Sequence, residues 1–283
     1  MFLVKFLNVG NNQAFFQLAN IVSEPNISFY ENSDKNRYDN VVSDLNLFRV
    51  ADNFHVQNWS NLALGKFVSY SEDELQSIKE KAFSQDEAEK KLKYFEANYV
   101  IVKKVSSLKR SDLSNFEIMK KLLQWLHEDY LFTGPAVFFM NFYLCPNKPG
   151  LKKMMKNQKR EGLRNATWDL TFIQEYMRNI KSEINGNRNQ RWLACSNDNA
   201  IKKIIPLLFA NNEESREDFE NRIKNAFVIS WGKNTGMGKK IYNLYCDYVR
   251  KSNLQARKVN QDNFGQHVEK MTKVLNEELN IEE

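Results

Sequence analysis

The chain has 283 residues, enough for one large domain or two small ones. Apolar residues make up 42% and charged residues 27%, which excludes a mainly disordered chain, and the 10 Gly and 5 Pro exclude collagen-like and low-complexity classes. The net charge of +6 directs attention to where the basic residues gather.

Residues 1–10 are apolar but include Lys5 and no small-residue cleavage site, so we interpret them as a first strand and not as a signal peptide. No run of about 18 apolar residues occurs, so we expect no membrane-spanning helix and no contact with a membrane. We therefore expect the protein to be cytoplasmic. The three cysteines and three histidines are too widely spaced for a zinc site or a disulfide framework. We expect the cysteines to be small buried side chains.

The first half of the chain changes in character near Ser71. Residues 1–60 contain three short β-like runs separated by Asn-rich turns, namely MFLVKFLNV, NISFYE and LFRVA. Helix formers dominate after Ser71, and SNFEIMKKLLQWLHEDYLF has a helix-period apolar stripe. The run AVFFMNFYLC fits either a buried strand or a buried helix. We therefore predict N-terminal strands of an α/β core in residues 1–60 and a helical insertion in residues 61–150.

Residues 151–203, the basic segment, carry the whole basic excess. They hold 12 Lys+Arg against 5 Asp+Glu, whereas residues 1–150 hold 17 against 18 and residues 204–283 hold 12 against 12. Such a cluster attracts a polyanion because binding releases condensed counterions. A solvated basic helix face and a membrane surface are the alternatives. The densest part predicts a nucleic-acid-binding surface formed by Lys152, Lys153, Lys156, Lys159, Arg160 and Arg164.

The remaining pattern is helix, strand and then helices. RNATWDLTFIQEYMRNIKSEI predicts a strong amphipathic helix, and RWLACS predicts a short buried strand. A further helix follows, which ends or kinks at Pro206, and three more helices complete the chain. We divide this part into residues 151–215, the basic segment with the second half of the core, and residues 216–283, a C-terminal helical region.

Two aspartates in the basic segment are candidate functional residues. Asp169 shares the predicted apolar face of its helix with Phe172, Ile173, Tyr176, Met177 and Ile180. A carboxylate that faces a core is costly unless it is paired or holds a cation, although a residue in the first turn would merely serve the helix dipole. Asp198 follows a predicted strand, where α/β folds form ligand sites, but it is also a good N-cap.

An inward Asp on a helix, followed by a strand that ends in Ser-Asn-Asp and by another helix, resembles the PIN-like nuclease family over about residues 160–210. WDLTFIQEY puts Asp169, and LACSNDNAIKKI puts Asp198, in the family's acidic positions, with Ser196 in the small hydroxyl position and Asn197 supporting it. The resemblance implies an α/β fold, with a PIN-like parallel sheet core, a large helical insertion and C-terminal helices.

The resemblance also implies a metal-dependent nuclease that cleaves phosphodiester bonds, in RNA rather than DNA, in a defence or toxin system. Its cofactor would be Mg²⁺ or Mn²⁺, which takes hard oxygen ligands, activates a water and neutralises charge on the phosphate. We therefore predict Asp169 and Asp198 as catalytic metal ligands. Glu117 is the candidate for a third ligand, with an exposed helix glutamate as the alternative.

The start of the chain departs from the family, which usually places its first Asp at the end of the first strand. Asn8, Asn11 and Asn12 occupy this part, and no acid precedes Glu24. Two alternatives therefore stay open, a catalytically inactive nucleic-acid-binding protein and a helical protein–protein adaptor. The sequence does not decide between a monomer, a homo-oligomer and a complex with a partner protein. The missing ligand would come from Glu31, Asp34, Asp39, Asp44 or Asp52.

Three weaker signals complete the predictions. Glu175 lies about 120° from the face of Asp169, so we expect it to face solvent. The loop WGKNTGMGKK lacks the Walker spacing, which excludes an ATPase and leaves a basic turn that could touch a phosphate. Four tryptophans are expected in the core: Trp125, Trp168, Trp192 and Trp231.

Overall fold

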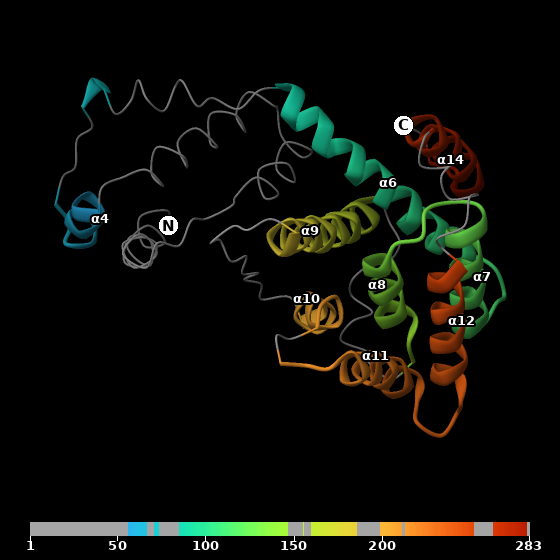
Figure 1. The fold of residues 1–283 in the computed structure, drawn as a ribbon. Helices are drawn as coiled ribbons and strands as arrows, with labels where there is room; N and C mark the ends of the chain where they lie inside the picture. Colours follow the sequence, from blue (N-terminus) through green and yellow to red (C-terminus); the bar gives the residue numbers. More distant parts are fainter. Residues whose placement is uncertain are drawn as a thin grey trace. The chain divides into compact units, whose positions relative to one another are not determined.

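The computed structural model is helical in the parts that it describes (Figure 1). These are residues 56–66, 71–73, 85–146, 155, 160–185, 199–210, 213–251 and 263–281. Helices make up 81% of them. The elements are α4 (Val56–Ala63), α6 (Gln85–Lys109), α7 (Asn115–Glu128), α8 (Gly134–Leu144), α9 (Arg160–Asn185), α10 (Asn199–Ile204), the 3₁₀ turn η2 (Ile205–Leu207), α11 (Arg216–Trp231), α12 (Met237–Lys251) and α14 (Phe264–Leu279).

The predicted parallel-sheet α/β core is wrong. The described residues contain no strand and no sheet, and they are all-α. The run AVFFMNFYLC forms α8, with Pro135 in its first turn, where the missing N–H breaks no hydrogen bond. A segment that is apolar on all sides fits a buried helix as well as a buried strand, and here the helix prevails. The strand-like runs MFLVKFLNV, NISFYE, LFRVA and RWLACS lie outside the described residues.

The chain divides into two compact units, residues 1–92 and 93–283. In the first unit, α4 buries Trp59, which is 2% exposed. The second unit contains α7 to α14 together with most of α6. The segment boundaries predicted at residues 60, 150 and 215 stay predictions.

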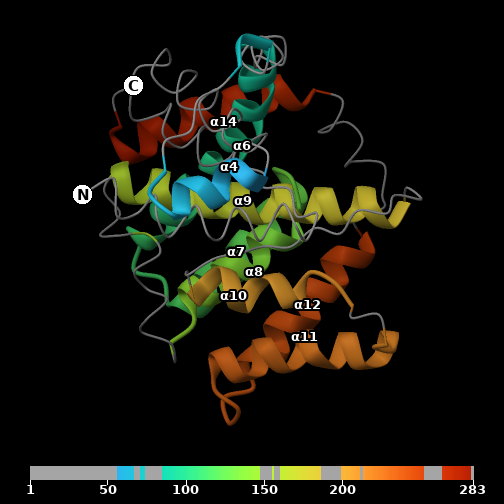
Figure 2. The same ribbon diagram turned by 90° about the vertical axis from the view of Figure 1, so that its left-hand side faces the viewer.

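Helix α8 lies at the centre of the second unit. It contacts α7, α9, α10 and α11, and both views show it between α9 and α11 (Figures 1 and 2). Its side chains are buried from Pro135 to Phe142 and again at Leu144. One polar side chain, Asn141, accepts a hydrogen bond of 2.7 Å from Nε1 of Trp231 on α11. The largely apolar composition of α8 therefore builds the core around which the other helices pack.

Several sequence-predicted helices are confirmed. Ser114 caps α7 by accepting a hydrogen bond from the N–H of Glu117, at 3.2 Å. α10 ends at Ile204, and Pro206 lies in the 3₁₀ turn that follows, as a helix-breaking proline predicts. The predicted apolar stripe of α7 is buried at Met119, Leu122, Leu123 and Leu126.

The side chains predicted to be buried follow the same pattern. Trp125, Trp168 and Trp231 are at most 8% exposed, which confirms them as core residues, and Trp192 lies outside the described residues. Cys145 is buried as predicted, whereas Cys246 is half-buried and Cys195 lies outside the described residues.

Helices α11 and α12 form a tight hairpin. A Cβ atom at Gly238 would lie 2.5 Å from the carbonyl oxygen of Phe227 and 2.6 Å from Cα of Val228. Only glycine fits such a close approach of two helix backbones without a shift. The connecting turn has positive φ angles at Gly232 (90°) and Gly236 (66°), which glycine adopts at little cost.

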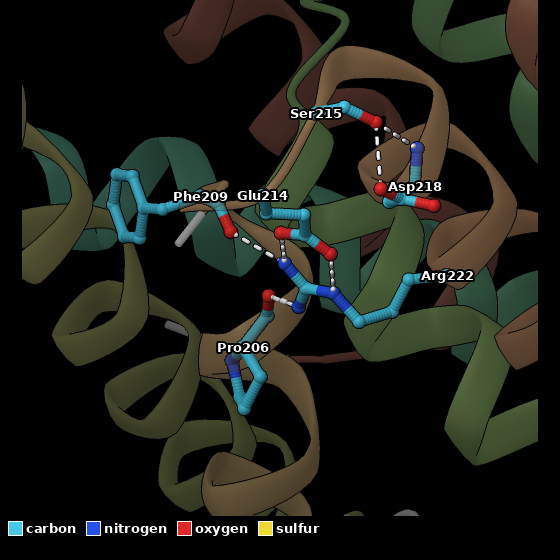
Figure 3. A network of polar contacts seen from close by, with 6 residues as sticks. All are labelled: Pro206, Phe209, Glu214, Ser215, Asp218 and Arg222. Atoms are coloured by element: carbon cyan, nitrogen blue, oxygen red, sulfur yellow. Dashed lines mark hydrogen bonds and ion pairs between the residues drawn. The ribbon is translucent and has the colours of Figure 1, made fainter. Parts of the chain in front are cut away.

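A polar network joins η2 to the start of α11 (Figure 3). Arg222 forms a two-pronged ion pair with Glu214, through Nε at 2.8 Å and Nη2 at 2.5 Å. The same guanidinium donates to the carbonyl oxygens of Pro206 and Phe209. These bonds satisfy carbonyl groups at the end of the 3₁₀ turn, so Arg222 fixes the connection between the two helices.

Helix α14 is fastened to α6 mainly by polar contacts. Lys103 donates to Oδ1 of Asn276 at 2.6 Å, and Ser107 donates to Oε2 of Glu278 at 2.6 Å. Arg110 donates to the carbonyl oxygen of Leu279 at 2.9 Å. Among the described helices, none combines the length and the apolar content needed to cross a membrane.

Candidate nucleic-acid interface

The structure describes four of the residues that the sequence singled out for function, namely Glu117, Arg160, Arg164 and Asp169. The predicted catalytic Asp198 lies outside the described residues. So do the supporting and phosphate-binding candidates Ser196, Asn197, Lys152, Lys153, Lys156 and Lys159.

Asp169 lies within α9, between the buried side chains of Trp168 and Leu170, and is itself half-buried. Because α9 begins at Arg160, Asp169 stands well inside the helix, and the alternative of a first-turn residue that serves the dipole does not hold. On the face predicted to be apolar, Ile173 is buried, whereas the other members are half-buried: Phe172, Tyr176, Met177 and Ile180.

Glu117 lies in the first turn of α7, with 43% of its side chain exposed. Its carboxylate pairs with Nζ of Lys120 at 3.2 Å. This is the arrangement of an ordinary surface glutamate, which was the alternative to a third metal ligand. In the part of the chain that the structure describes, no group of three or more His, Cys, Asp and Glu side chains could hold a metal ion.

Glu175 does not face solvent, contrary to the prediction. It is only 6% exposed, and its carboxylate pairs with Nη1 of Arg178 at 3.2 Å. The guanidinium of Arg178 in turn lies 3.8 Å from the ring centroid of Tyr94 on α6. The reason is that α9 contacts α8 and α10 and also packs on α6, so more than one side of the helix is covered. A rotation of about 120° away from the apolar face therefore does not lead to water.

Most of the described basic side chains of α9 and α10 are exposed, whereas two described acidic side chains, Asp169 and Glu175, are not. These two helices contact each other. Among their described side chains, Glu161 is the one exposed acid, because Asp169 is half-buried and Glu175 is buried. The exposed basic residues are Arg160, Arg178, Lys181, Lys202 and Lys203. The described exposed charges of these two helices are therefore mainly basic.

Arg164 is held over aromatic rings at the point where α9 crosses α6. Its guanidinium carbon lies 5.1 Å from the ring centroid of Phe95 and 5.7 Å from that of Tyr99. The side chain is half-buried, and burial lowers the pKa of Arg164 from its usual value. Stacking of this kind is worth about 0.5–2 kcal/mol.

The crossing of α6 with α9, called here the α6–α9 crossing, is formed by Phe95, Asn98 and Tyr99 with Arg164, Trp168 and Thr171. The Phe95 and Trp168 rings lie 4.4 Å apart. Asn98 donates a buried hydrogen bond of 3.0 Å to Oγ1 of Thr171, whose hydroxyl donates to the carbonyl oxygen of Thr167.

Two buried donors at this crossing are not satisfied by the protein. The Tyr99 hydroxyl and Nε1 of Trp168 have no hydrogen-bond partner among the described residues. Tyr99 is 5% exposed and Trp168 4% exposed. Each unsatisfied group costs about 1–3 kcal/mol of stability. Sequence reasoning found Trp168 only as a core residue and missed Tyr99, because nothing in the local pattern marks a tyrosine whose hydroxyl is unpaired.

Comparisons with known proteins give this chain no relatives. The sequence matches no protein-family model, no curated protein and no solved structure.

Proposed function

We propose that this protein binds a nucleic-acid strand, RNA more readily than DNA, through its basic segment, and that α9 and α10 form the helical part of the interface. The observation that carries the proposal is the separation of charge on these helices. Five of their six described basic side chains are exposed, whereas Asp169 is half-buried and Glu175 is buried.

This arrangement favours a polyanion for an electrostatic reason. Exposed lysine and arginine side chains replace the counterions condensed on a phosphate backbone, and the released ions drive binding. Acidic groups at the same surface would repel the backbone, but the carboxylate of Glu175 is buried against Arg178. The preference for RNA comes from the sequence resemblance alone.

The test is the binding of fluorescently labelled single-stranded RNA and DNA, followed by anisotropy over a range of salt concentrations. We expect the logarithm of the association constant to fall linearly with the logarithm of the salt concentration. In a double variant, Lys202→Ala with Lys203→Ala, we expect weaker binding and a salt slope that is shallower by about 1.4, because each phosphate contact on a single strand contributes about 0.7.

The chain offers a matched control for this variant. Lys270 and Lys273 are a second pair of exposed lysines, on α14 and outside both the basic segment and the loop WGKNTGMGKK. Replacing both with alanine changes the net charge by the same amount and should leave the salt slope unchanged. Equal losses in both double variants, or no salt-dependent binding by the wild type, would overturn the proposal and favour the adaptor hypothesis.

Metal-dependent cleavage of the bound strand is a separate proposal, which rests on the sequence positions of Asp169 and Asp198. The same labelled strands, incubated with Mg²⁺ or Mn²⁺, test it. Cleavage by the wild type that is lost in Asp169→Asn and in Asp198→Asn, with binding retained, would support a nuclease. Binding without cleavage would support a protein that only binds the strand.

A further inference from the structure

The α6–α9 crossing combines hydrogen-bond donors that lack acceptors with positive charge. Tyr99 and Trp168 both flank Phe95, at ring-centroid distances of 5.8 Å and 4.4 Å. The neighbouring polar groups of the crossing, Asn98 and Thr171, are paired with each other. The protein therefore satisfies one polar pair at this crossing and leaves two of its donors unsatisfied among the described residues.

The charged groups around Tyr99 are mostly cations. Nζ of Lys103 lies 4.1 Å from the centroid of the Tyr99 ring, and the guanidinium of Arg164 lies over the same ring. Arg160 is close enough to act electrostatically on the hydroxyl, and Glu96 opposes it. Among the described residues, the charged groups placed at Tyr99 are therefore three cations and one carboxylate.

The Tyr99 hydroxyl acts as a donor under ordinary conditions. Burial raises the pKa of Tyr99, Glu96 raises it further, and Arg160 acts in the opposite direction. The hydroxyl therefore stays protonated at neutral pH. Protonated Tyr, the Trp indole and the Arg guanidinium all offer N–H or O–H groups, and the indole and guanidinium cannot accept a hydrogen bond. The complementary ligand is an anion whose oxygens only accept.

We propose that the α6–α9 crossing binds a phosphate group of the nucleic-acid strand through the Tyr99 hydroxyl and the Arg164 guanidinium, with Nε1 of Trp168 as a second unsatisfied donor of the same crossing. This inference rests on the proposed function, because the strand supplies the phosphate. Arg160, exposed at the first residue of α9, extends the site toward solvent.

A phosphate reaches the site by displacement of a side chain. The Tyr99 hydroxyl and Nε1 of Trp168 are covered in this structure. Arg164 is half-buried and lies over the Phe95 and Tyr99 rings. Because its side chain is long and has several rotatable bonds, it can swing outward with the phosphate as a bidentate partner. The hydroxyl beneath then gains an acceptor.

The experiment compares two tyrosines that differ in one respect. Tyr99 and Tyr130 are both buried, but the Tyr130 hydroxyl donates to the carbonyl oxygen of Ala97 at 2.9 Å, whereas the Tyr99 hydroxyl has no described partner. Tyr99→Phe should raise the melting temperature of the free protein and weaken strand binding about tenfold, the effect of one hydrogen bond to a charged group. Tyr130→Phe should lower the melting temperature and leave the affinity unchanged.

The outcomes separate failure of the site from failure of the proposed function. If the wild type binds the strand and Tyr99→Phe binds it with the same affinity, the phosphate site is overturned and the proposal of strand binding is retained. Should the wild type bind no strand, inorganic phosphate becomes the probe: it should raise the melting temperature of the wild type but not that of Tyr99→Phe. Equal phosphate effects on the wild type and Tyr99→Phe would overturn the site as well.

Discussion

Helices α8 and α9 are both packed inside residues 93–283, but they are covered in different ways. α8 is surrounded by apolar side chains, and its one polar residue, Asn141, accepts a hydrogen bond from Trp231 while its amide nitrogen has no described partner. α9 buries the hydroxyls of Thr167 and Thr171 and the carboxylate of Glu175. The first helix serves stability, because burial of apolar area is the dominant favourable term in folding.

At the α6–α9 crossing, the burial of polar groups has a use in ligand binding. Unsatisfied donors at Tyr99 and Trp168 lower the stability of the free protein, as the amide nitrogen of Asn141 does in α8. A ligand that accepts hydrogen bonds recovers this free energy on binding. The contrast between α8 and α9 therefore predicts that substitutions around α8 change stability alone, whereas Tyr99→Phe changes stability and binding in opposite senses.

The largest effect on stability is expected in α8 itself. Phe139 is completely buried. Phe139→Ala should lower the free energy of unfolding by about 3–5 kcal/mol, because it removes the transfer free energy of the ring and leaves a cavity. Urea unfolding measures this. The control is Val274→Ala on α14, where the side chain is 42% exposed and a change within about 0.5 kcal/mol is expected. A loss below 1 kcal/mol at Phe139 would show that α8 is not the core.

The second largest effect on stability is expected at the ion pair between Arg222 and Glu214. Arg222→Met leaves the carboxylate of Glu214, whose side chain is 12% exposed, without its two-pronged partner. Breaking a fully buried ion pair costs about 3–5 kcal/mol, so this partly exposed one should cost about 2–4 kcal/mol. Arg216→Met is the matched control, since that arginine is 91% exposed in its pair with Glu220 and should contribute at most about 0.5 kcal/mol. Similar losses in both variants would contradict the role given to burial.

The third effect tests the close approach of α11 and α12. Gly238→Ala places a Cβ against the backbone of Phe227 and Val228, which cannot move as a side chain tip can. We expect a loss of about 1–3 kcal/mol, typical of overpacking. Gly265→Ala, in α14, meets no atom within 4 Å and should be neutral or stabilising by up to about 1 kcal/mol. Thermal unfolding of both variants compares them, and a neutral Gly238→Ala would mean that the hairpin is not tightly packed.

Helical periodicity was enough to predict most of the described elements. α7, α9, α11, α12 and α14 follow from apolar stripes and caps, because these signals are local. α8 could not be assigned, since a segment without a polar face has no period to read. The parallel sheet was inferred from strand-like runs and from a resemblance confined to about residues 160–210. The described residues contradict it with an all-α arrangement.

The candidate site was less predictable for a different reason. The exposed Arg160 and the half-buried Arg164 belong to a basic segment that composition alone reveals. The burial of Glu175 depends on helices that cover α9 from several sides, and the unpaired hydroxyl of Tyr99 depends on what lies across from it on α9. Both are tertiary properties, so neither spacing nor residue type in one segment could reveal them.

The smallest effect is the change of stability at high pH that follows from the different pKa shifts of Tyr245 and Tyr99. Burial, with a further contribution from Cys246, raises the pKa of Tyr245 to about 12, against 10.0 in the unfolded chain. The folded state therefore holds this proton more tightly, so its stabilising contribution is complete below pH 10 and is lost as the pH rises toward 12. At Tyr99 the shift is opposed by Arg160.

Tyr245→Phe should therefore flatten the decline of the melting temperature between about pH 10 and 12 more than Tyr99→Phe does. Tyrosinate absorbance measured alongside compares the two hydroxyls, since the signal lost in Tyr245→Phe should appear at a higher pH in the wild type than the signal lost in Tyr99→Phe. An equal flattening in both variants would mean that Arg160 does not act on Tyr99. The positive environment from which the phosphate site at the α6–α9 crossing is argued would then lose one of its supports.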